Sequence, residues 1–81
     1  MSARHRHEKN TLRVLEGEAE EAWRVLKAYR TVLDDFKIKE LAAPVVLRAA
    51  LLTAEDAVDD LANRVAAQRH KLAMMSKNKE A

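Results

Sequence analysis

Apolar residues recur every three or four positions from Leu12 to Phe36, and this repeat constrains the fold more than any other feature of the sequence. The spacing keeps one side of an α-helix apolar, whereas a β-strand would repeat every two residues. A second repeat of the same kind runs from Leu47 to Met75 and contains one polar member, Gln68. The sequence therefore predicts two long amphipathic helices. The members of the two repeats are Leu12, Leu15, Ala19, Ala22, Leu26, Tyr29, Leu33 and Phe36, and then Leu47, Leu51, Ala54, Val58, Leu61, Val65, Gln68, Leu72 and Met75.

The helix bounds follow from the residues that start and stop helices. We expect helices at about 9–37 and 44–76, because Pro44 fits a first helical position but not a helix interior. Asn10 or Thr11 could cap the first helix. The segment that begins at Thr53 resembles a capping box, which would split the second helix, but the apolar repeat passes through it unchanged and favours one helix.

The two segments outside these helices, 1–9 and 77–81, lack the apolar repeat and are rich in Lys and Arg, so we expect frayed basic ends. At 81 residues the chain forms one domain, residues 1–81. No apolar run is long enough to span a membrane or serve as a signal peptide, and there is no cysteine, so we expect a cytoplasmic protein.

A short turn makes antiparallel packing of the two helices the default, so the predicted fold is an all-α helical hairpin. Charge supports this orientation, because it places the acidic block Glu16–Glu21 beside the basic block Arg64–Lys71. Glu18 with Arg64 is the ion pair that we expect between the helices. Such pairs select an orientation more than they supply stability.

Large apolar residues flank both repeats, and a lone hairpin would leave them in water. Covering each one contributes roughly 2 kcal/mol. A homodimer with four helices is the simplest way to cover them, and a different partner protein is the alternative. The residues that we expect at this dimer or partner interface are Trp23, Val25, Val32, Val46 and Leu52.

The sequence offers little catalytic chemistry, and we predict no catalytic, metal-binding or cofactor-binding residues. His5 and His7 lie in the expected basic arm, where with His70 they would form a weak ligand set. The paired acids fall outside the apolar repeats, and the single glycine rules out a glycine-rich phosphate loop. We therefore expect a protein that is not an enzyme.

Charge is divided unequally along the chain. Residues 1–13 and 64–81 hold nine Lys or Arg and two acids, whereas residues 14–63 hold six and eleven. An antiparallel hairpin would gather the basic segments at one end, where they could contact phosphates or an acidic protein. The candidate contact residues are Arg4, Arg6, Lys9, Arg13, Arg64, Arg69 and Lys71.

These features favour a small protein-interaction module, a coiled-coil homodimer that binds and modulates a larger protein, with inhibition as one such mode. Compact helical proteins of this kind are common among regulators encoded by phages and mobile elements. The alternative is a small nucleic-acid-binding dimer that uses the basic end. A third hypothesis is a coiled-coil spacer without a partner or bound nucleic acid.

Overall fold

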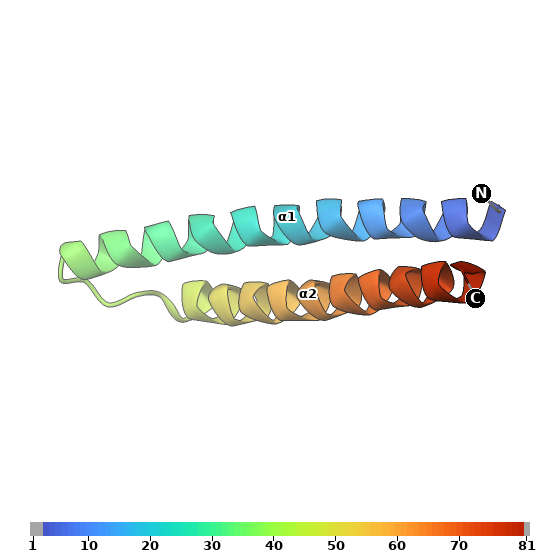
Figure 1. Ribbon diagram of the computed structural model, residues 1–81. Helices are drawn as coiled ribbons and strands as arrows, with labels where there is room; N and C mark the ends of the chain where they lie inside the picture. The colour runs from blue at the N-terminus through green and yellow to red at the C-terminus, as the bar shows by residue number, and fades with distance from the viewer. Residues whose placement is uncertain (1–2, 81) are drawn as a thin grey trace.

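The computed structural model describes residues 3–80, and side chains are described for residues 3–77. Over this range the chain forms two antiparallel helices, α1 (Ala3–Ile38) and α2 (Val45–Glu80), joined by residues 39–44 (Figure 1). The hairpin is a rod with extents of 61 × 17 × 15 Å. The turn lies at one end of the rod and the two chain ends lie at the other, so the predicted all-α hairpin is confirmed.

Both helices extend further than the sequence predicted at the end of the rod where the termini meet. Helix α1 begins at Ala3 rather than near residue 9, and α2 continues to Glu80 rather than ending near residue 76. Residues 3–9 and 77–80, expected to be frayed, are helical. The remaining residues of the expected frayed ends, Met1, Ser2 and Ala81, lie outside the described residues.

The early start of α1 has a packing reason. The side chain of Glu8 is buried against α2, which holds this end of α1 in place. Thr11 consequently lies inside the helix rather than at its start, and its hydroxyl donates to the carbonyl oxygen of His7 at 3.1 Å. The prediction of an N-cap at Asn10 or Thr11 is therefore wrong.

The two apolar repeats form the seam between the helices. Every residue in both repeats is buried or partly buried. Leu26 is the most deeply buried, with 2% of its surface exposed, and Ala54 and Val65 are also buried. The three-four spacing therefore identified the contact surface of each helix correctly.

Helix α2 passes through Thr53 without a break. The Thr53 hydroxyl donates to the carbonyl oxygen of Ala49 at 3.1 Å, one turn earlier in the same helix. A capping threonine would instead accept a hydrogen bond from an amide further along the chain. The segment is therefore one helix, as the uninterrupted apolar repeat favoured.

The turn begins with a residue in the left-handed region, Glu40, which has a φ of 56°. The amide of Glu40 donates to the carbonyl of Lys37 at 3.1 Å, and the amide of Leu41 donates to that of Phe36 at 2.9 Å. This pair of hydrogen bonds is the Schellman motif, in which glycine usually occupies the left-handed position. Helix α2 then begins after Pro44, whose carbonyl accepts a hydrogen bond from the Arg48 amide at 3.2 Å.

The predicted ion pair between Glu18 and Arg64 is wrong within a single chain. The Arg64 side chain instead pairs with Asp60, one turn earlier in α2, at 3.1 Å. The ion pair that does cross between the acidic and basic blocks joins Glu16 to Arg69, at 2.9 Å. The predicted antiparallel orientation is correct, but the conformation of each long side chain decides whether it pairs within its own helix or with the other helix.

The hairpin leaves an unusually large surface exposed for its mass. Its accessible area is 6270 Å², whereas a compact monomer of 9.2 kDa exposes roughly 4,900 Å². Two helices that touch along one seam can each cover only one side of the other. The excess of about 1,300 Å² is surface that a third or fourth helix would cover in a bundle.

Candidate functional site

One side of the seam carries an open apolar groove of about 400 Å³ in the half of the rod near the turn. We call this side the groove side, and it also includes Val32, seven residues after Val25 on α1. No charged residue lines the groove, and the Thr53 hydroxyl is already hydrogen-bonded within α2. The lining residues are Ala22, Val25, Tyr29, Ala50, Thr53, Ala54 and Ala57.

The opposite side of the seam is polar. Trp23 lies there, with the Lys27 ammonium and the Arg30 guanidinium each 5.5 Å from its ring centre. At this distance the cations attract the ring face. A smaller groove of about 270 Å³ on this side is lined by Trp23, Leu26, Arg30, Glu55, Val58 and Asp59. Trp23 therefore lies among charges.

The five residues predicted for the dimer or partner interface are thus divided between different surfaces. Trp23 and Val25 are about 200° apart around α1, since each residue turns the helix by about 100°. Val25 and Val32 share the groove side. Val46 and Leu52 lie on α2 near the turn and are largely exposed, at 80% and 63%. The structure gathers only part of the predicted set onto one side of the seam.

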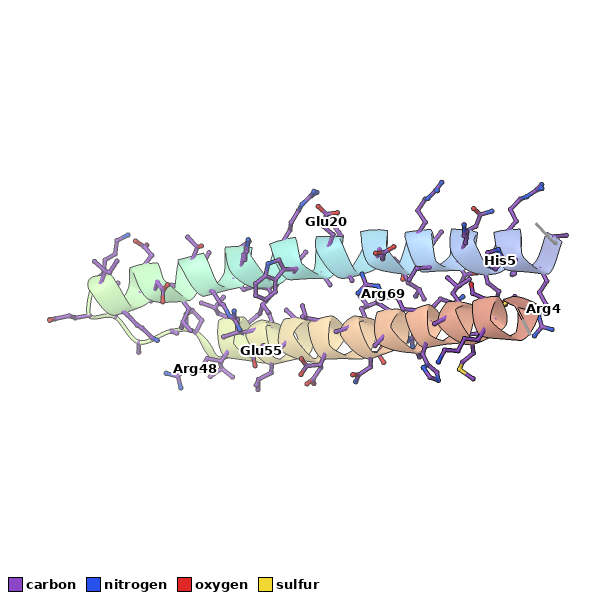
Figure 2. All side chains as sticks on the ribbon, in the orientation of Figure 1. Arg4, His5, Glu20, Arg48, Glu55 and Arg69 are labelled. Carbon is purple, nitrogen blue, oxygen red and sulfur yellow. The ribbon has the colours of Figure 1, made fainter. Side chains whose placement is uncertain are left out.

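A second apolar surface surrounds the turn. Ile38 ends α1 and Val45 begins α2, and each exposes about four fifths of its surface. Charged residues border it, and Figure 2 shows Arg48 projecting away from α1 there. We call this surface the turn-end patch, which consists of Ile38, Leu41, Val45, Val46 and Leu52.

The interface predicted from the sequence did not include three members of this patch, Ile38, Leu41 and Val45. The available signal was the presence of large apolar residues in and beside a turn, where they have no seam to pack against. Such residues in a cluster mark an interaction surface more often than isolated ones do.

A buried polar cluster joins the helices near the chain ends. The Gln68 amide donates to the Glu8 carboxylate at 2.6 Å and to the Glu8 backbone carbonyl at 3.0 Å. The Lys71 ammonium lies 3.0 Å from the other carboxylate oxygen. Both Glu8 and Gln68 expose only 9% of their surface. The Gln68 hydrogen bond, followed by that of Lys71, lowers the pKa of Glu8 below its ordinary value.

From its position in the repeat alone, Gln68 is either a buried residue that sets the register of the helices or part of a frayed end. Gln68 is buried and hydrogen-bonded, so it does not belong to a frayed end. Glu8 was not among the residues predicted for the seam, although counting back four and then three residues from Leu12 reaches Glu8 and His5. A polar residue in one repeat indicates a polar partner in the other.

The cations predicted to contact phosphates lie in the half of the rod that holds the two chain ends, although Arg64 is near the middle of α2. Three of them are occupied by carboxylates within the chain: Arg64 by Asp60, Arg69 by Glu16 and Lys71 by Glu8. Figure 2 shows Arg69 extending from α2 toward α1. Within residues 3–77, the cations without an ion pair in this set are Arg4, Arg6, Lys9 and Arg13.

The described residues contain no group of three or more His, Cys, Asp or Glu side chains placed to hold a metal ion. His5 is partly buried beside the seam, whereas His7 and His70 are exposed. In the same part of the chain, neither helix has a stretch long and apolar enough to cross a membrane.

No protein-family model matches the chain, and no curated protein or solved structure shows significant similarity to it. Function is therefore inferred from the surfaces of the hairpin itself: the groove side, the turn-end patch and the basic end.

Proposed function

We propose that this protein is a non-enzymatic interaction module that forms a homodimer and binds a larger protein, whose activity it modulates. The observation that carries the proposal is the concentration of exposed large apolar side chains around the turn. Contiguous exposed apolar surface is unfavourable in water and is found where proteins bind one another. The large excess of accessible area supports the same reading, because one hairpin covers too little of its own surface.

The two apolar surfaces suit two different contacts. The groove side is a channel along the seam, which a helix can fill. The turn-end patch lies around the turn at the tip of the rod (Figure 1), so it can contact a larger partner while the rest of the rod remains outside. Lys37, Lys39 and Arg48 are balanced there by Asp34, Asp35 and Glu40, so the proposed partner surface is apolar rather than strongly charged.

The partner-binding half of this proposal can be tested with a matched pair of substitutions. Leu52→Asp introduces a charge into the turn-end patch, whereas Met74→Asp introduces the same charge at an exposed position on the same outward side of α2, far from the turn, 44% against 63%. Affinity capture from nuclease-treated lysate should retain a protein on the wild type and on Met74→Asp but lose it on Leu52→Asp. Titration calorimetry with the purified partner should show the same difference. Equal capture by all three would refute binding through the turn.

The homodimer is tested separately by light scattering over a range of concentrations. We expect the mass of two chains at micromolar concentration. A single-chain mass at every concentration would remove the dimer from the proposal without affecting the contact at the turn.

Nucleic-acid binding is the second candidate function, and one observation favours it. The hairpin brings the ends of both helices together, which places Arg4, Arg6, Lys9 and Arg13 at the basic end without carboxylate partners within residues 3–77. Phosphate binding by these cations would weaken steeply as salt rises. A mobility shift at low salt that Arg6→Glu and Arg13→Glu abolish would support it. The absence of any shift at low salt would remove it.

A further inference from the structure

We propose that the groove side binds a second copy of this chain with a two-fold axis parallel to the rod, so that Glu18 of each copy pairs with Arg64 of the other. This inference rests on the proposed homodimer and specifies its surface and orientation. All four helices would then be antiparallel to their neighbours, with both turns at one end of the bundle.

The first argument is the match of large and small residues. On the groove side, α1 presents Val25 and Val32, and α2 presents Ala50 and Ala57. Each pair is separated by seven residues, so its members lie on one side of a packed helix. We call two residues level when they lie at the same position along the rod. Because the helices are antiparallel, a step of seven residues forward in α1 and a step of seven back in α2 move the same distance along the rod in the same direction. Val25 and Ala57 line the same groove, so we take them as level, and Val32 is then level with Ala50.

A two-fold axis parallel to the rod preserves these levels and sets α1 of one copy against α2 of the other. Val25 and Val32 would then face Ala57 and Ala50 of the second copy. Large side chains opposite small ones interdigitate without strain. Alanine positions also let the helices approach closely, and the lining of the groove adds no charge that would have to be buried.

The second argument is charge. Glu18 lies seven residues before Val25, and Arg64 lies seven residues after Ala57. These two residues are therefore also level with each other on the groove side. Within residues 3–77 Glu18 makes no ion pair, and Arg64 is held only by Asp60 of its own helix. The proposed axis places Glu18 beside Arg64 of the second copy, twice by symmetry.

The alternative two-fold axis, perpendicular to the rod, reverses one copy against the other. With the two rods overlapping along their full length, it would place Glu18, Arg64 and Lys71 of one copy against the apolar groove of the other. A charge buried against apolar surface without a partner is strongly unfavourable. The parallel axis therefore matches the residues on the groove side and the perpendicular axis does not.

The third argument is area. A stable protein interface buries about 800 Å² on each partner. The hairpin exposes about 1,300 Å² more than a compact monomer of its mass, so one such interface removes surface that the fold leaves uncovered. The turn-end patch lies at the tip and remains free for the proposed larger partner.

The test uses two charge reversals on the full chain, Glu18→Arg and Arg64→Glu. In each variant alone, like charges would meet twice across the interface, and we expect the dimer Kd to rise about tenfold. When the two variants are mixed, opposite charges meet at both sites. Native mass spectrometry should then show heterodimers well above the statistical half.

Mixing distinguishes a contact between copies from one within a chain. A Glu18–Arg64 contact inside one hairpin would be repulsive in both variants and would remain so after mixing. Asp34→Arg, a reversal at another exposed position of α1 on the side of the seam that carries Arg30, serves as the control and should leave the dimer Kd unchanged. Circular dichroism checks that all variants remain helical.

The outcomes separate the two proposals. A wild-type dimer whose variants mix at the statistical ratio would overturn this orientation and leave the homodimer standing. A wild-type monomer would overturn both. Selective heterodimers without capture of any larger protein would support this inference while counting against partner binding.

Discussion

The half of the rod near the turn and the half near the chain ends share one seam but differ in what surrounds it. Near the ends, Glu8 is held by Gln68 and Lys71, and Glu16 is held by Arg69, so polar contacts cross between the helices. Near the turn, no ion pair crosses the seam among the described residues, and an apolar groove lies open instead. The comparison teaches that the polar contacts between the helices are concentrated in one half, whereas most of the exposed large apolar side chains lie in the other.

The largest test of this comparison is whether the halves unfold together. Leu26 lies in the half near the turn and is the most buried residue, so Leu26→Ala should lower the free energy of unfolding by about 2–5 kcal/mol. Urea unfolding followed by circular dichroism measures this loss. Val14→Ala, at an exposed position, should change it by less than about 0.5 kcal/mol.

Two separate transitions in the Leu26→Ala protein would show that the halves are independent units. A single transition at lower urea would show that the seam couples them despite their different surroundings.

The polar cluster can be removed in two ways, which should have different effects on the free energy of unfolding. Gln68→Ala removes the hydrogen bonds to Glu8 and should cost about 1–3 kcal/mol. The double variant Glu8→Leu with Gln68→Leu replaces both partners by apolar residues and should recover most of that loss. Urea unfolding of the single and double variants gives the coupling between the two positions. Additive effects would mean that the two side chains do not stabilise each other.

Acid should weaken the half near the chain ends selectively. The pKa of Glu8 is lower in the folded protein than in the unfolded chain, so the unfolded state binds more protons as the pH falls. The stability from this group is complete above the ordinary glutamate pKa of about 4.3 and is lost as the pH falls through the lower folded pKa. Hydrogen exchange should show faster opening near Gln68 than near Leu26 on acidification.

Glu8→Gln is the control for this acid response. It should flatten the dependence of stability on pH over that window, because its amide does not titrate. An unchanged slope would assign the acid response to other carboxylates.

The smallest expected effect lies at the turn. Glu40 has a positive φ, which costs most residues about 1–2 kcal/mol relative to glycine. After allowing for the greater freedom of glycine in the unfolded chain, Glu40→Gly should stabilise the hairpin by about 0.5–1 kcal/mol. Thermal unfolding measures the gain, and Glu40→Ala should not reproduce it. Lower stability in Glu40→Gly would mean that the Glu40 side chain makes a stabilising contact.

Much of this fold could be predicted from the sequence because the apolar spacing is a local property. All members of the repeat from Leu12 to Phe36 lie at the seam, and the antiparallel orientation follows from a short turn. The Schellman motif at Glu40 could not be anticipated, because glutamate is an unusual residue for a left-handed position.

The surfaces were harder to predict than the seam. Trp23 and Val25 are close in sequence, but the helix turns them to opposite sides, so a list of flanking apolar residues does not define one surface. Glu8 was assigned to a frayed end because the apolar count began at Leu12. The expected partner of Arg64 was wrong because several rotamers of a long side chain can reach a carboxylate within its own helix.

The position of the chain ends has a practical consequence for labelling experiments. Fluorophores attached near Ala3 and near Lys77 would report on the same pole of a rod 61 Å long, and neither would sense events at the tip. A donor at Ala42 and an acceptor near Ala3 would span most of that length within one hairpin. Efficient energy transfer between Ala42 labels on separate molecules would then reveal chains that associate with their tips together.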